Sequence, residues 1–454
     1  MREFTRVSDH MPTCLFSPMG WRQIGKRGIS RRRGTERRRR CDLVSCSARL
    51  PHLKAKSTIW RTRVGNGLLA SHAVHFIFDV MQRKSNLDLR QQVGQLLIMG
   101  FDGTGMSAHL RSMLGTLHPS GVILFKRNIA EAAQTHALLR EAQKTVATPM
   151  FRCVDMEGGT VDRFRDVIAP IPSVADVAAT RSMRLFHKQG KLIGQQLRAM
   201  VFNTDFAPCV DLGFEESKSA LGSRTVSADP VETVRYAREF LGGLHDAGIL
   251  GCGKHFPGLG CASLDSHHAL PSIEKTWEQI WREDLVPYRR MRKELSMVMV
   301  AHVSYPKITG DKTPASLSKK WINGVLRDKI GYRGLVISDD LDMGGVLNSA
   351  SIEEAAVETL RAGSDLFLVC QKEEHVWRAY EAVFKQAESD KSFAKLVAMK
   401  AKRVRDFKTK SAELRARMSP PPSSSKVDVL RRRVWEFTEE LRAHSIIAPE
   451  DRAL

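Results

Sequence analysis

The sequence predicts an α/β fold, a (β/α)8 barrel of the TIM type in a regular or distorted form. Three observations lead to this prediction: eight short apolar runs recur along the middle of the chain, helix-like segments separate most of them, and charged residues stand at the ends of several runs. Continuous apolar strands with helices between them are typical of a parallel sheet covered by helices. Eight such repeats within roughly 300 residues favour a closed barrel over an open sheet.

Each apolar run is expected to form one strand, because the runs are short, nearly continuous in apolar residues and bounded by polar segments. In chain order they span residues 94–101, 121–125, 149–155, 201–208, 249–255, 297–303, 334–340 and 364–370.

Three of the intervening segments carry clear helix signals. Residues 130–146 are rich in Ala, Leu, Glu and Gln, residues 229–248 have Pro230 in the first turn, and residues 316–331 begin at a serine and close on a glycine. Proline in the first turn, serine ahead of the apolar positions and glycine after the last turn mark helix boundaries. We therefore expect a helix in each of these segments.

The chain is predicted to have four parts. Residues 1–84 form a basic and disordered N-terminal extension, residues 85–375 form the barrel, and residues 376–418 continue as helices that pack on it. The stretch "SPPPSSS" then opens a last part, residues 419–454, made of a linker and a C-terminal helix.

The N-terminal extension carries much of the positive charge. Residues 1–80 hold 17 Lys and Arg against 5 Asp and Glu, which is +12 of the net +21. We favour a solvated tail, or translated sequence upstream of a start at Met81, over an arm that binds nucleic acid or an anionic surface. Nucleic acid is accordingly not an expected partner.

Cysteine usage and hydropathy indicate a cytoplasmic protein. Most of the cysteines in the body of the chain lie in apolar strand-like runs, which is typical of buried thiols in a reducing compartment. Cys41 and Cys46 have no second pair at zinc-site spacing. No apolar run reaches the roughly 20 residues that span a bilayer, and no export signal is evident.

Charged and polar residues cluster at the ends of five predicted strands. These residues are Asp155, Glu157, Asp205, Asp211, Lys254, His255, His302, Asp339 and Asp340. One such residue alone would most often be a helix cap or a satisfied polar group. Because the C-terminal strand ends of a barrel share one rim, the cluster predicts a functional site there.

The loop after the fifth strand adds titratable groups to this rim. Asp265 and His267 are two residues apart, so their side chains can meet in a turn. A carboxylate on one imidazole nitrogen raises the basicity of the other and makes a proton shuttle. Asp339, at the end of an apolar strand, is a candidate nucleophile. A fixed carboxylate opposite a mobile acid/base is what cleavage of a glycosidic bond with retention requires.

Two motifs carry a family resemblance. "KHFPGLGCASLDSHHALP", residues 254–271, resembles the KHFPGHG-x4-DSH-x3-P signature of bacterial β-N-acetylglucosaminidases of glycoside hydrolase family 3. "VISDDLDMGGV", residues 336–346, resembles the nucleophile strand of that family. Further segments such as "VDMEGGTVDRFR", "FAPCVDL" and "AGSDLFLVC" agree, so the resemblance covers residues 88–375.

The resemblance implies a role for each site residue. Asp339 would attack the anomeric carbon, His267 would act as acid and then base, and Asp265 would orient His267. Asp340 would be structural. The residues expected to hold sugar hydroxyls are Asp155, Arg163, Lys254, His255 and Arg224. No metal and no organic cofactor is implied.

The sequence departs from the signature at three positions. Leu259 stands where the family has histidine, Met156 where it has glutamine, and Thr160 where it has arginine. These changes bear on substrate preference and rate, and they leave the proposed nucleophile and dyad in place.

The resemblance implies a monomer that releases terminal β-linked N-acetylglucosamine from peptidoglycan fragments (muropeptides) or chito-oligosaccharides by double displacement. Phosphorolysis of the same bond and a β-glucosidase activity are alternatives within the family. A metal-dependent barrel hydrolase using His255, His267, His268 and His302 is a second alternative, although no His-x-His pair lies in the first strand. The arginine-rich arm alone suggests a third, a nucleic-acid or envelope-binding protein with a degenerate barrel.

Overall fold

The computed structural model describes residues 87–262, 264, 266 and 269–446. The predicted N-terminal extension therefore lies outside the described residues, and so do Asp265, His267 and His268.

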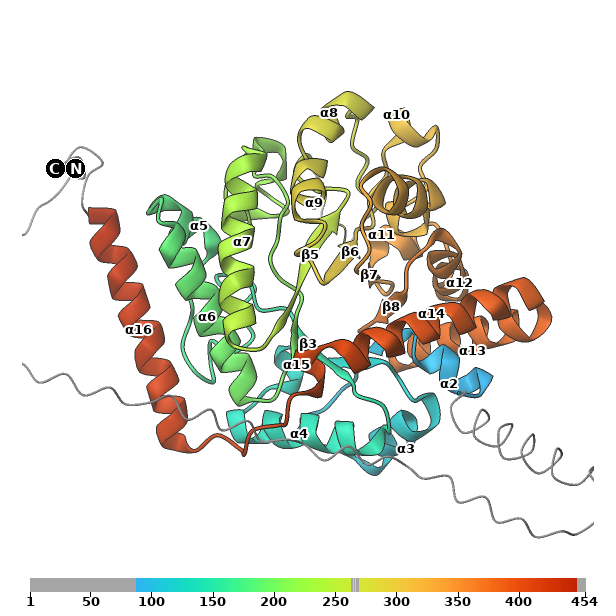
Figure 1. Ribbon diagram of the computed structural model, residues 1–454, viewed down its shortest axis with the longest axis horizontal. Coiled ribbons are helices and arrows are strands. Elements are labelled where there is room, and N and C mark those ends of the chain that lie inside the picture. The colour runs from blue at the N-terminus through green and yellow to red at the C-terminus, as the bar shows by residue number, and fades with distance from the viewer. Residues whose placement is uncertain (1–86, 263, 265, 267–268, 447–454) are drawn as a thin grey trace, which may run out of the picture. The chain divides into compact units, whose positions relative to one another are not determined.

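Eight parallel strands close into a barrel, in which each strand pairs with the next and β1 pairs with β8 (Figure 1). The predicted (β/α)8 fold is confirmed. The strands are β1 Leu97–Met99, β2 Gly121–Ile123, β3 Phe151–Val154, β4 Thr204–Asp205, β5 Leu250–Phe256, β6 Met297–Val300, β7 Leu335–Asp340 and β8 Leu366–Val369.

Helices cover the outer side of the barrel and continue beyond it. They are α2 Leu89–Gly94, α3 Ala108–Leu117, α4 Ala132–Thr145, α5 Val174–Ala179, α6 Met183–Ala199, α7 Pro230–Asp246, α8 Trp277–Arg282, α9 Leu285–Met291, α10 Pro306–Thr309, the π-helix η5 Lys320–Lys329, α11 Gly344–Leu347, α12 Ile352–Ala362, α13 Glu373–Ser389, α14 Lys391–Lys410, α15 Ala412–Arg415 and α16 Ser424–Ile446. Short 3-10 turns are η1 Lys126–Asn128, η2 Glu215–Ser217, η3 Gly222–Arg224 and η4 Ala315–Leu317.

Two predicted helices form nearly as expected and a third differs. α4 and α7 lie within the predicted segments. Asp229 caps α7 by accepting a hydrogen bond from the Val231 N–H, and Pro230 is the first residue of this helix. The segment 316–331 instead divides into the 3-10 turn η4 and the π-helix η5. Single-sequence periodicity does not distinguish these turn types from an α-helix.

The fourth strand is much shorter than the run that predicts it. Val201 has a positive φ of 61°, and the Phe202 N–H donates to the Leu197 carbonyl, so the start of the run closes α6. Only Thr204 and Asp205 pair as a strand. An apolar run buried at a helix end looks like a buried strand in sequence.

The register shifts twice, at the ends of β5 and β7. β5 changes its pairing with β6 between Gly253 and Phe256, and β7 changes its pairing with β8 between Ile337 and Asp340. Such irregularities redirect side chains. Lys254, His255 and Asp339 all lie within them.

The last helices follow the barrel on its outer side. α13 packs against α12 and α14, and α14 places the buried ammonium of Lys408 2.6 Å from Gln95 Oε1. After a proline-rich turn, α16 runs alongside α6 and contacts α5 (Figure 1). None of the described helices is both long enough and apolar enough to cross a membrane.

Candidate active site

A cavity opens at the C-terminal ends of the barrel strands and encloses about 820 Å³, part of it open to solvent. Six predicted site residues line it together: Asp155, Arg163, Arg224, Lys254, His255 and Asp339. The predicted dyad of Asp265 and His267 lies outside the described residues. Their described neighbours Leu264 and Ser266 line this cavity.

Asp339 is the last residue but one of β7, and its side chain is partly exposed to the cavity. Its Oδ1 accepts the Asp340 N–H at 2.8 Å. Burial opposes ionisation, but the charges of His255 and His302 and the backbone donor outweigh it, so the pKa of Asp339 lies below its usual range. Asp339 is therefore ionised near neutral pH, as a nucleophilic carboxylate must be.

Asp340 is buried and bonds to the backbone beside it. Its Oδ1 accepts the Cys370 N–H at 2.9 Å and the Asp342 N–H at 3.1 Å, which ties the end of β7 to the segment after β8. Burial, aided by the neighbouring charges of Asp342 and Asp339, raises the pKa of Asp340 to about 7. The two adjacent aspartates thus differ in ionisation because their surroundings differ.

An ion network fills one side of the cavity. Lys254 Nζ lies 2.6 Å from Asp155 Oδ1 and 2.7 Å from Glu157 Oε1. Arg224 donates to both Glu157 oxygens, at 2.9 Å each. Burial opposes ionisation of Glu157, yet Arg224 and Lys254 hold its pKa far below its usual range. Two cations and two carboxylates in fixed positions offer donors and acceptors to a polyhydroxylated ligand.

Glu157 is the centre of this network, although the sequence places it only among the rim residues and indicates no specific role for it. Its only sequence signal is its place two residues after Asp155, behind the third strand. The structure also shows that Arg224, expected to hold sugar hydroxyls, is committed by two hydrogen bonds to Glu157.

Arg163 has a different environment. Its guanidinium lies 5.7 Å from the centre of the Phe125 ring, and both residues line the cavity. Its Nε is buried and has no hydrogen-bond partner in the part of the chain that the structure describes. A buried donor without a partner is costly, so this guanidinium is suited to receive a ligand oxygen.

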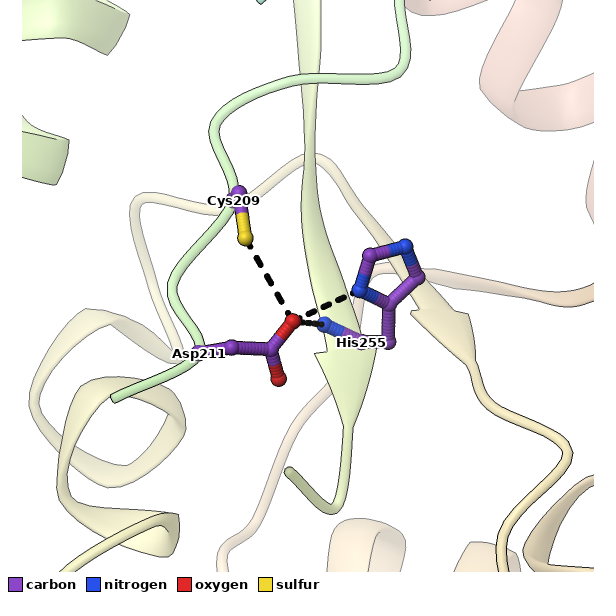
Figure 2. A group of neighbouring side chains, drawn as sticks. All are labelled: Cys209, Asp211 and His255. Carbon is purple, nitrogen blue, oxygen red and sulfur yellow. Dashed lines mark hydrogen bonds and ion pairs between the residues drawn. The ribbon is translucent and has the colours of Figure 1, made fainter. Parts of the chain in front are cut away.

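His255 is oriented by Asp211, another residue to which the sequence analysis gives no specific role. Asp211 Oδ2 accepts from His255 Nδ1 at 2.6 Å and from the His255 N–H at 3.2 Å, and the Cys209 thiol donates to the same oxygen (Figure 2). Burial opposes ionisation, but the charge and hydrogen bonds of His255 hold the pKa of Asp211 below its usual range. Nδ1 therefore carries the proton, and Nε2 faces the Arg224 Nη2 donor at 3.4 Å.

Cys209, Asp211 and His255 are also the described residues whose ligand atoms lie close enough to hold a metal ion. Their geometry does not fit one. Two ligands of a tetrahedral zinc ion stand about 3.3 Å apart, whereas His255 Nδ1 and Asp211 Oδ2 are at the hydrogen-bond distance of 2.6 Å. Burial raises the pKa of Cys209 well above its usual value, with Asp211 contributing, so the thiol stays protonated. The cluster is a hydrogen-bond network.

Two further residues predicted at the rim, Asp205 and His302, lie behind the cavity. Asp205 accepts the Met156 N–H, and its pKa is raised well above the usual range by burial. His302 contacts Ser316 Oγ at 2.7 Å and the Asp340 carbonyl at 2.9 Å.

The three residues that depart from the family signature differ in burial and in their distance from the cavity wall. Leu259 lines the cavity and donates its backbone N–H to Asp211 Oδ1 at 2.8 Å. Met156 is fully buried, and Thr160 is exposed. Leu259 is therefore the departure that changes the wall of the cavity.

Comparisons with known proteins agree with this site. The chain matches the family described as Glycosyl hydrolase family 3 N terminal domain over residues 88–407, more than half of its length. A Beta-hexosaminidase of Idiomarina loihiensis is 37% identical over 278 residues, which cover 60% of this chain and 83% of that protein. A Beta-hexosaminidase of Thiobacillus denitrificans is 38% identical over 285 residues, which cover 61% and 79%.

A solved structure is similar as well. A glycoside hydrolase family 3 beta-N-acetylglucosaminidase from Paenibacillus sp. is 31% identical, with a TM-score of 0.72, and the match covers 78% of this chain and 69% of that one. The fold, the cavity and these relatives lead to one conclusion: the chain belongs to glycosyl hydrolase family 3 and is a glycoside hydrolase.

Proposed function

We propose that the protein is a retaining exo-β-N-acetylglucosaminidase, an enzyme of the β-N-acetylhexosaminidase class. The observation that carries the proposal is the place of Asp339 near the end of β7, where it faces a cavity lined by Lys254, Asp155 and Arg163. The likeness to named Beta-hexosaminidases and to a beta-N-acetylglucosaminidase supports the choice of sugar.

In the proposed mechanism, Asp339 attacks the anomeric carbon and the glycosidic oxygen leaves with a proton from His267. A covalent glycosyl-enzyme ester results. His267, oriented by Asp265, then takes a proton from water, whose oxygen attacks the same carbon and releases Asp339. Two inversions give net retention.

Binding of the sugar is assigned to the charged network. Lys254 and Asp155 hold sugar hydroxyls, as does Arg163, whose buried Nε has no partner among the described residues. His255 is held between Asp211 at Nδ1 and Arg224 at Nε2, and it lines the wall beside the bound sugar. Arg224 keeps Glu157 in place and thereby fixes Lys254.

For the biological substrate we propose a peptidoglycan fragment with terminal β-linked N-acetylglucosamine, with chito-oligosaccharides as the second candidate. We propose a monomer acting in the cytoplasm without cofactor. The five described cysteines are free thiols, which supports a reducing compartment.

Initial rates on an aryl β-N-acetylglucosaminide and on the matching aryl β-glucoside, in phosphate-free buffer, test the sugar preference. We expect a strong preference for the N-acetyl sugar. Comparable rates on both would contradict the proposal. A rate that requires added phosphate, with the sugar 1-phosphate as product, would establish phosphorolysis instead.

Asp339→Ala tests the nucleophile. Removing the attacking carboxylate should lower kcat by a factor of about 1,000 or more while the circular dichroism spectrum stays unchanged. Full activity in the folded variant would refute the assignment of Asp339.

A further inference from the structure

The C-terminal helix α16 lies beyond the family match, which ends at residue 407. It nevertheless packs on α5 and α6, and Arg431 of α16 reaches the segment that joins β3 to α5. We define this segment as the β3–α5 loop, residues 155–173. The loop carries four residues that line the cavity: Asp155, Glu157, Val161 and Arg163.

The two halves of the β3–α5 loop are tied together by one carboxylate. Asp162 Oδ1 accepts the Phe164 N–H at 2.8 Å, and its Oδ2 accepts the Ile171 N–H at 2.9 Å. The Gly159 N–H donates to the Ile171 carbonyl at 3.0 Å. A displacement of the outer half, around Ile168 and Ile171, is therefore transmitted to the half that carries the cavity residues.

α16 holds the outer half directly. Arg431 Nε donates to the carbonyl of Ile168 at 2.9 Å, and the same guanidinium pairs with Asp428 at 2.6 Å. Ile168 is buried. Ile168 follows Asp162 by six residues and Arg163 by five. Arg431 therefore contacts the loop close to both residues in the chain.

α16 is itself firmly attached to the barrel. Leu430, Val434, Phe437 and Leu441 bury its inner face. Glu440 pairs with both Arg184 and Lys188 of α6. The helix is therefore a fixed support for the loop, because its attachment to α6 does not depend on Arg431.

From these contacts we propose that α16 positions the sugar-binding loop, and that Arg431 is the positioning residue that acts through Ile168 on Arg163. The inference rests on the proposed function. The guanidinium of Arg163 has a buried Nε without a partner among the described residues and lies 5.7 Å from the Phe125 ring, so the backbone that carries Arg163 sets the place of this guanidinium together with Phe125. Displacements of about 1 Å are enough to weaken binding and catalysis.

The experiment compares two neighbouring arginines of α16 in the full chain. Arg431→Met removes the donor to Ile168 but keeps a long apolar side chain. Arg432→Met is the matched control, since Arg432 is exposed and lies 3.6 Å from Glu436 of its own helix. On an aryl β-N-acetylglucosaminide we expect KM to rise about fivefold to tenfold in Arg431→Met, with kcat within about twofold of the parent. Arg431→Lys, which retains a donor, should recover part of the loss.

An unchanged KM in Arg431→Met, or the same change in both variants, would refute the proposal. A fall of kcat and thermal stability without a change in KM would show that Arg431 only supports folding, and would refute it too. If the parent cleaves no N-acetylglucosaminide, the proposed function fails on its own. In that case, hydrogen exchange of residues 155–173 tests the positioning role of Arg431. The proposal requires faster exchange of this loop in Arg431→Met and unchanged exchange in Arg432→Met.

Discussion

The orientation of His255 depends on a single carboxylate. Asp211 accepts a hydrogen bond from His255 Nδ1–H. It also accepts hydrogen bonds from the backbone N–H groups of His255 and Leu259. It keeps Nδ1 protonated and turns Nε2 toward Arg224 Nη2, 3.4 Å away. Neither the residue type nor its position in "FAPCVDL" distinguishes this role from that of a loop cap.

Asp211→Asn tests that orientation. The amide can still accept the Leu259 N–H, but its NH2 group meets the Nδ1–H of His255, donor against donor. We expect kcat/KM to fall by about 10-fold to 100-fold on an aryl N-acetylglucosaminide. The matched control is Asp365→Asn, a buried aspartate that accepts the Val336 N–H near the start of β7. That variant should lose stability and keep kcat/KM, and equal losses of kcat/KM in both would contradict the role of Asp211.

Asp340 makes stability depend on pH. Its pKa is about 7 in the fold against 3.8 ordinarily. Between these values the native state binds more protons than the unfolded chain, so the free energy of unfolding falls as pH rises from about 4 to about 7. The effect is at most about 4 kcal/mol.

Asp340→Asn removes this titration and keeps the acceptor for the Cys370 N–H. The Tm of the variant relative to the parent should therefore increase between pH 4 and pH 7 and then level off. Thermal melts across that range measure it. A difference in Tm that does not vary with pH would contradict the raised pKa.

At the scale of elements, the helices α6 and α7 pack without room for a side chain at Gly190 and Gly243. A Cβ on Gly243 would lie 2.2 Å from the His187 carbonyl oxygen and 2.4 Å from the Lys191 nitrogen, both backbone atoms of α6. Gly243→Ala should lower the free energy of unfolding by about 1 to 3 kcal/mol.

Gly115→Ala is the matched control for that change. Gly115 lies on α3, and the nearest atom to an added Cβ is 4.0 Å away. Alanine there should raise the free energy of unfolding by about 0.5 to 1 kcal/mol, because it lowers the entropy of the unfolded chain. Chemical denaturation measures both. A Gly243→Ala protein as stable as Gly115→Ala would disprove the close packing.

The strands were predictable from sequence because a parallel barrel buries both of their faces, which leaves continuous apolar runs. The register shifts in β5 and β7 were not, since they depend on the pairing of strands distant in sequence. The π-helix η5 and the two-residue β4 were missed for the same reason: tertiary contacts, not local pattern, decide them.

At the scale of the molecule, the sequence predicts which strand ends meet, but not which charges pair. Lys254 and Glu157 are far apart in the chain and are 2.7 Å apart in space. Spacing along the sequence carries no information on such a pair. The central position of Glu157, between Lys254 and Arg224, emerges only when the barrel closes.

The central claim is that Asp339 forms a covalent bond with the sugar. Reaction with a 5-fluoro-N-acetylglucosaminyl fluoride, which slows breakdown of a glycosyl-enzyme, followed by mass spectrometry of the digested protein, tests it directly. We expect a single adduct on the peptide that contains Asp339, absent when Asp339→Ala is treated identically. An adduct on another residue, or continued turnover with no adduct, would contradict it.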